Sequence, residues 1–158
     1  MIVDDESLAL SRLKRLLNEN GIEDITAFDN PIEALKEITK TKFDAVFLDI
    51  SMPNITGLEL ADSIIQLEPK TFIIFQTAYS EFALEAYKNG GMGYLVKPIE
   101  SNDIKNILEK VRNFKSSLSE ESKKILGKRG DKLYLININD IYYIKADLDE
   151  VIVRIKDA

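Results

Sequence analysis

The sequence predicts an α/β fold, a doubly wound five-stranded parallel sheet, with a short and incomplete antiparallel β segment at the C-terminal end. Five short apolar segments alternate with five segments of helical character, and the apolar segments 45–48 and 72–75 are almost uninterrupted. Such alternation is typical of parallel strands joined by helices, and continuous apolar strands suit the buried centre of the sheet. After residue 128, β-branched and aromatic residues become frequent, which indicates the antiparallel segment.

The elements of the first part follow one another in a regular order. Strands are predicted at 1–3, 24–28, 45–48, 72–76 and 93–96, and helices at 7–20, 31–39, 57–67, 81–89 and 101–114. Leucines at helical spacing support the first helix, with Gly21 as its end, and Asn30-Pro31 is a typical start for the second. The last helix has an apolar stripe that continues past residue 114: Ile104, Ile107, Leu108, Val111, Phe114 and Leu118.

The chain after residue 118 divides into a polar stretch and a β-rich stretch. Residues 119–128 are mostly polar or charged and are expected to form a linker. Strands are predicted at 132–138, 141–146 and 151–156, and the last shows the two-residue alternation of a strand. A unit of this size has too little core to be stable alone.

Composition excludes several classes of protein. No apolar run approaches the roughly 20 residues that a membrane-spanning helix needs, so no membrane partner is expected. The absence of Cys excludes disulfides and thiolate metal sites, and it fits a cytoplasmic location. The absence of His removes the usual zinc ligand and the commonest general base, so carboxylates must carry the chemistry.

Three of the predicted strands end in charged side chains. The first strand is followed by Asp4 and Asp5, the third by Asp49 and the fifth by Lys97. The carboxyl ends of parallel strands meet at one edge of the sheet, which is where open α/β sheets bind ligands. Carboxylates this close repel one another unless a cation holds them, so the cluster predicts a divalent metal with oxygen ligands. Mg²⁺ is the natural occupant, because it favours carboxylates, water and phosphate oxygens.

These residues, in this order, resemble the receiver domain of bacterial two-component response regulators. The resemblance covers residues 1–118 and is highly specific, because it rests on five separated features. They are Asp4-Asp5, Asp49 with Met52-Pro53 and Gly57, Thr77-Ala78, Tyr94, and Lys97-Pro98. The resemblance implies the flavodoxin-like strand order 2-1-3-4-5 and a signalling module that is not an enzyme.

The resemblance also implies a role for each residue of the site. Asp49 is the phosphoacceptor, since a carboxylate can attack a phosphoryl group and form an acyl phosphate. Lys97 and Thr77 contact the phosphoryl oxygens, and Thr77 and Tyr94 form a switch. Mg²⁺ is held by oxygen ligands: Asp5 and Asp49 directly, the backbone carbonyl of Ser51, and Asp4 mainly through water.

A second resemblance concerns the C-terminal part. Residues 131–146 resemble the opening strands of the LytTR DNA-binding domain, so 129–158 is predicted to be an N-terminal fragment of such a domain. The two resemblances imply a regulator that a sensor histidine kinase phosphorylates and that controls transcription through DNA. This fragment is not itself expected to bind DNA specifically, and a homodimer through residues 81–114 is also expected.

Two alternatives remain open at this point. An aspartyl-phosphate-forming phosphatase usually has a second Asp two residues after the nucleophile, where this chain has Ser51. A non-phosphorylated receiver used only as a dimerisation module normally lacks one of the acidic, Thr or Lys positions, and all of them are present here.

Overall fold

The structure, a computed structural model, describes residues 1–78, 91–121, 124–129, 132–147 and 150–155. The chain divides into two compact units, Met1–Phe114 and Lys115–Ala158. The helix predicted at 81–89 lies outside the described residues. Within the described ranges, no helix is both long and apolar enough to cross a membrane.

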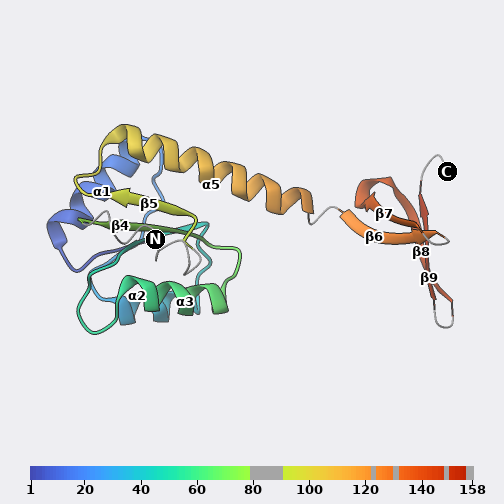
Figure 1. The fold of residues 1–158 in the computed structure, drawn as a ribbon, viewed down its shortest axis with the longest axis horizontal. Coiled ribbons are helices and arrows are strands. Elements are labelled where there is room, and N and C mark those ends of the chain that lie inside the picture. Colours follow the sequence, from blue (N-terminus) through green and yellow to red (C-terminus); the bar gives the residue numbers. More distant parts are fainter. Residues whose placement is uncertain (79–90, 122–123, 130–131, 148–149, 156–158) are drawn as a thin grey trace. The chain divides into compact units, whose positions relative to one another are not determined.

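The first unit contains one five-stranded parallel sheet (Figure 1). Its strands are β1 (Ile2–Val3), β2 (Ala27–Phe28), β3 (Ala45–Asp49), β4 (Phe72–Thr77) and β5 (Gly93–Val96). The order is β2-β1-β3-β4-β5, which confirms the prediction. Strand β2 is shorter than predicted, because only Ala27 and Phe28 pair with β1.

Helices cover both faces of the sheet (Figure 1). Helices α1 (Ser7–Glu19) and α5 (Ser101–Glu121) lie on one face, and α2 (Pro31–Ile38) and α3 (Gly57–Leu67) lie on the other. At the start of α2 the Asn30 side chain accepts a hydrogen bond from the Ile32 N–H at 2.9 Å. A full capping box begins α3, where the side chains of Thr56 and Glu59 each accept a hydrogen bond from the other's backbone N–H. These caps fix where each helix begins.

Alternate residues of the same strands build two separate apolar cores. Val46, Leu48 and Phe75 belong to the core under α2 and α3, whereas Phe47 and Ile74 belong to the core under α1 and α5. Side chains of a strand point alternately to opposite faces, so both sets are buried only if helices cover both faces. This arrangement explains why β3 and β4 read as nearly continuous apolar runs.

Beyond the end of α5, the second unit forms two antiparallel hairpins, which agrees with the predicted antiparallel character of this segment. Strand β6 (Lys124–Arg129) pairs with β7 (Lys132–Asn137), and β8 (Ile141–Asp147) pairs with β9 (Glu150–Ile155). A short 3₁₀ helix, η2 (Ile138–Asp140), lies between β7 and β8, and each hairpin forms its own two-stranded sheet.

The linker predicted at 119–128 needs correction. Helix α5 continues to Glu121, and Lys124–Arg129 forms strand β6. The physical reason is pairing with a partner that lies later in the chain: Ile125 and Leu126 stand opposite Ile136 and Leu135 in the hairpin. The charged residues around these two apolar positions hide the strand in the sequence, because cross-strand pairing and not local composition stabilises it.

Candidate functional site

The candidate site continues the apolar rows of the core under α1 and α5. Each of four neighbouring strands has an apolar core residue and, two positions further along the chain, a polar residue at or just past its carboxyl end. Residues two apart in a strand share a face, so the four polar residues meet at the carboxyl edge of the sheet. The four pairs are Ile2 and Asp4, Phe47 and Asp49, Ile74 and Gln76, and Leu95 and Lys97.

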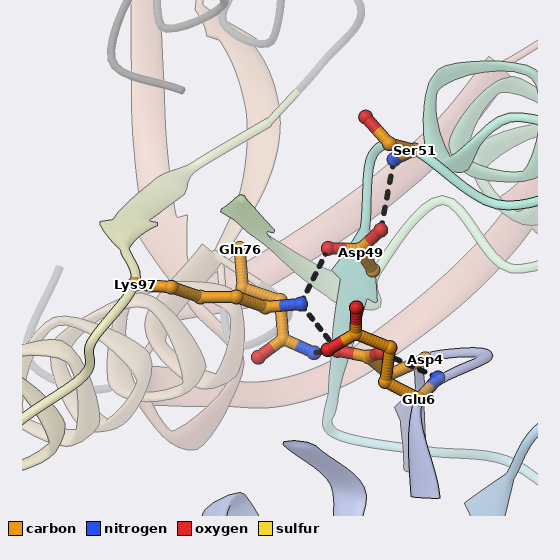
Figure 2. Close-up of polar contacts among 6 residues, drawn as sticks. All are labelled: Asp4, Glu6, Asp49, Ser51, Gln76 and Lys97. Atoms are coloured by element: carbon orange, nitrogen blue, oxygen red, sulfur yellow. Dashed lines mark hydrogen bonds and ion pairs between the residues drawn. The ribbon is translucent and has the colours of Figure 1, made fainter. Parts of the chain in front are cut away.

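One ammonium group joins two buried carboxylates at the centre of the site (Figure 2). The Nζ atom of Lys97 lies 2.7 Å from Asp4 Oδ2 and 2.8 Å from Asp49 Oδ1. Asp4 is completely buried and Asp49 is only 5% exposed, so water screens these ion pairs weakly. The peptide bond between Lys97 and Pro98 is cis.

Backbone and amide donors complete the hydrogen bonding of both carboxylates. Asp4 Oδ1 accepts from the Glu6 N–H at 3.0 Å, and Asp49 Oδ2 accepts from the Ser51 N–H at 2.9 Å. The side-chain amide of Gln76 donates from Nε2 to Asp4 Oδ2 at 3.2 Å. Each carboxylate oxygen of Asp4 and Asp49 therefore accepts a hydrogen bond, which is what burial of these groups requires.

Burial disfavours the charged form of both partners of the ion pair, but it determines the pKa shift of only one of them. Burial raises the pKa of the Asp4 carboxyl, and the bonds from Lys97 and the Glu6 N–H offset this effect only in part. Burial also opposes the charge of Lys97, but the hydrogen bonds to Asp4 and Asp49 outweigh it and raise the Lys97 pKa above its usual range. Lys97 has two carboxylate partners, whereas Asp4 shares this one ammonium with Asp49, whose negative charge repels it, and this explains the difference. Lys97 is therefore a permanent cation at neutral pH.

The loop after Asp49 is held by a glycine that no other residue can replace easily. The Gly57 N–H donates to the carbonyl of Ile50 at 3.0 Å, so the start of α3 lies directly against the end of β3. A Cβ atom at Gly57 would overlap the backbone carbonyl of Asp49. The close approach of the two backbones, which only Gly permits, thus supports the position of Asp49.

The structure brings together some predicted site residues and separates others. Asp4, Asp49 and Lys97 are in contact, whereas Asp5 is exposed. Thr77 is buried at the end of β4, and its carbonyl accepts a hydrogen bond from the Lys97 N–H at 2.8 Å. Tyr94 is half-buried and packs against the core under α2 and α3.

Sequence reasoning missed Gln76, which is 1% exposed and contacts Asp4. One feature of the sequence could have revealed it, because Gln76 is a polar residue in the otherwise apolar run 72–76. In the structure it stands directly opposite Asp49 in the sheet register. A large amide in a buried strand needs a polar partner, and the predicted site is the nearest one.

The donor chemistry of the site fits a hard divalent cation. Asp4 and Asp49 offer carboxylate oxygens, the ligands that Mg²⁺ prefers. Among the residues that the structure describes, no three acidic side chains converge on one point. Lys97 supplies the positive charge between Asp4 and Asp49, and the exposed Asp5 is the neighbouring carboxylate that could add a third ligand. The residues therefore fit the metal in type.

Comparison with known protein families shows the family to which the chain belongs. The profile of the response regulator receiver domain matches residues 1–109, which include every residue of the site. The chain belongs to this family, and it is the receiver of a two-component response regulator. Such a receiver is a signalling module and not an enzyme.

Two curated relatives extend the similarity beyond the receiver. An uncharacterised response regulatory protein of Shewanella oneidensis is 39% identical over 96% of this chain and 66% of its own length. The transcriptional regulatory protein YpdB of Escherichia coli K12 is 32% identical over 92% of this chain and 64% of its own length. The chain thus spans just under two thirds of each of these relatives, and the similarity includes most of the second unit.

Two solved structures are similar to this chain over most of its length. The response regulator TrrA of Thermotoga maritima, in complex with Mg²⁺–BeF, has a TM-score of 0.64 and 36% identity over 70% of this chain and 95% of that chain. A response regulator of Burkholderia pseudomallei with a phosphorylated aspartic acid, a calcium ion and citrate has a TM-score of 0.61 and 29% identity. That similarity covers 76% of this chain and 70% of the Burkholderia chain.

Proposed function

We propose that this chain is the phospho-acceptor part of a transcriptional response regulator, with Asp49 as the residue that a sensor histidine kinase phosphorylates. The observation that carries the proposal is the pairing of a buried carboxylate, Asp49, with the single ammonium of Lys97 at the carboxyl edge of the sheet. The two similar structures, one with Mg²⁺–BeF and one with a phosphorylated aspartic acid, support the same chemistry.

Each residue of the site has a role in the proposed reaction. Asp49 attacks the phosphorus atom of the donor and forms an acyl phosphate, while the leaving group departs on the opposite side. Lys97 already contacts Asp49 Oδ1, so its charge is in position to stabilise the phosphoryl oxygens. The Ser51 N–H holds the other oxygen of Asp49 and keeps the carboxylate oriented.

Mg²⁺ is the proposed cofactor. Asp5 and Asp49 would hold it directly, the backbone carbonyl of Ser51 would add an oxygen, and Asp4 would act mainly through water. When bound, the ion offsets the negative charges of the acidic residues and of the phosphoryl group.

The proposed switch consists of Thr77 and Tyr94. Thr77 ends β4 next to Lys97, and its hydroxyl would donate to a phosphoryl oxygen on Asp49. Tyr94, which is half-buried, would then turn further inward. Hydrogen exchange of the described residues 91–97 should respond to phosphorylation in the parent and respond far less in Thr77→Ala.

The proposed regulator has two partners: the sensor histidine kinase that phosphorylates the receiver, and the DNA that the output domain binds. Residues 1–118 would act as the receiver, and the hairpins of the second unit would begin a LytTR-type DNA-binding domain. The similarity to a transcriptional regulatory protein across most of the chain supports this output. DNA would be bound through a complete output domain and not by residues 1–158 alone. A homodimer through residues 81–114 and a cytoplasmic location belong to the same proposal.

Incubation with acetyl phosphate and Mg²⁺, followed by intact-mass measurement, tests the proposal. We expect one added phosphoryl group, none in Asp49→Asn, and none in excess chelator. An unmodified parent protein would favour the non-phosphorylated dimerisation module. Turnover that releases phosphate from many substrates would favour the phosphatase.

A further inference from the structure

Gln76 is a buried amide whose contact with Asp4 has no place in the mechanism above. Its side chain comes from β4, and its Nε2 atom donates to Asp4 Oδ2 at 3.2 Å (Figure 2). An ionised carboxylate only accepts hydrogen bonds, so Gln76 must present its NH₂ group and not its oxygen to Asp4. This hydrogen bond is needed for stability, because a buried amide without a partner would destabilise the fold.

The Oδ2 atom of Asp4 is shared by two donors of different kinds. The Lys97 ammonium donates to Asp4 Oδ2 at 2.7 Å and also to Asp49 Oδ1 at 2.8 Å. The Gln76 carboxamide is neutral, and it donates to Asp4 Oδ2 at 3.2 Å. If Lys97 turns to a phosphoryl group on Asp49, as the proposed function requires, Asp4 Oδ2 loses its charged donor. A buried carboxylate that loses a donor is destabilised unless another donor remains. Gln76 is that donor.

We propose that Gln76 is a positioning residue of the receiver, whose carboxamide holds the Asp4 carboxylate in place while Lys97 leaves it for the phosphoryl group. This inference rests on the proposed function. A neutral amide suits the task because it stabilises Asp4 without adding a charge that would compete for the phosphoryl oxygens. Its fixed place opposite Asp49 in the sheet keeps it near both acidic residues.

Gln76→Met tests the role, because methionine has a similar length and no donor. Gln66→Met, at an exposed position of α3, is the matched control. Two quantities are measured with Mg²⁺ present: the rate constant of phosphorylation by acetyl phosphate, and the dissociation constant of fluoroberyllate by ¹⁹F NMR. In Gln76→Met we expect phosphorylation about tenfold slower and fluoroberyllate binding about tenfold weaker, as for one lost hydrogen bond to a charged group. The control should change neither.

The Asp4→Asn background separates positioning from packing. If Gln76 acts through Asp4, adding Gln76→Met to Asp4→Asn should change fluoroberyllate binding less than about twofold, because contacting residues are coupled. An equal tenfold loss in both backgrounds would mean a packing role and would overturn the proposal.

Gln76→Glu provides a second variant in case the methionine protein does not fold. It places a carboxylate against Asp4 and should weaken fluoroberyllate binding more than Gln76→Met does, and parent-like binding would overturn the proposal. Normal phosphorylation of the parent with unchanged rates in both Gln76 variants would refute the role of Gln76 alone. Absence of phosphorylation in the parent would instead refute the proposed function.

Discussion

The two compact units of the chain differ in how far their apolar side chains are buried. In the receiver sheet Ile73 and Ile74 are completely buried, whereas in the second unit Leu135 is 72% and Val151 is 68% exposed. The receiver strands are paired and covered by helices on both faces, so most of their apolar residues lie in one of the two cores. The hairpins are two-stranded, and a two-stranded hairpin is marginally stable by itself. The well-packed first unit therefore carries the site, whereas the described hairpins of the second unit bury little apolar surface.

Replacement of a glycine should show this contrast most strongly. Gly57→Ala places a methyl group against the backbone carbonyl of Asp49, which cannot move without disturbing β3. We expect the free energy of unfolding to fall by about 4 kcal/mol or more. In the second unit, a Cβ at Gly127 would meet only the tip of the Ile136 side chain, which can rotate away. Urea denaturation should therefore show a loss below about 1 kcal/mol for Gly127→Ala. Equal losses for the two variants would contradict the contrast.

Truncation of an isoleucine gives the next largest difference. Ile74→Ala removes a completely buried side chain from the core under α1 and α5, and should cost about 3 kcal/mol through lost transfer energy and a cavity. Ile144→Ala, at a position that is 59% exposed in β8, should change the free energy of unfolding by about 0.5 kcal/mol or less. Circular dichroism during denaturation measures both. A large loss at Ile144 would show that the second unit is packed more tightly than its exposure indicates.

The charge of Lys97 gives a smaller effect with a definite pH dependence. Lys97→Met should lower the free energy of unfolding at pH 7 by about 2 kcal/mol, because it leaves two buried carboxylates without the cation they share. Because the folded protein raises the Lys97 pKa, this stabilisation is complete below about pH 10.4 and is lost as the pH rises through the folded-state value. The difference between parent and variant should therefore be constant from pH 7 to 9 and shrink above about pH 10.4. If the difference in the free energy of unfolding between parent and variant grew with pH, the folded protein would lower the Lys97 pKa and not raise it.

Binding to DNA should show the smallest effect. Residues 1–158 alone should not retard a specific DNA fragment in a gel at about 150 mM salt, the ionic strength at which exposed charges are largely screened. Lys128 and Arg154 are exposed and could contact phosphates, but such contacts carry no sequence information. Tight, sequence-selective retardation would show that the second unit is functionally complete.

Much of the receiver could be predicted from sequence because its signals are local and repeated. Each strand has its own apolar run, and the charged residues at the strand ends mark the site even before the fold is known. Gln76 was missed because its meaning depends on the register with β3, a long-range property. Strand β6 was missed for the same reason, since its apolar pair Ile125-Leu126 is short and finds its partners only across the hairpin. The exposure of Asp5 also depends on the fold, because sequence gives Asp4 and Asp5 the same chemistry.

The most direct test of the account is to locate the phosphoryl group. The protein is treated with acetyl phosphate and Mg²⁺, the acyl phosphate is reduced with borohydride, and the modified residue is identified by peptide mass spectrometry. We predict that reduction converts Asp49 to homoserine, because its carboxylate is oriented by the Ser51 N–H, contacts Lys97 and, unlike that of the fully buried Asp4, keeps some exposed surface. Homoserine at Asp4 or Asp5, or at no acidic residue in a protein that has gained the mass of a phosphoryl group, would contradict the account.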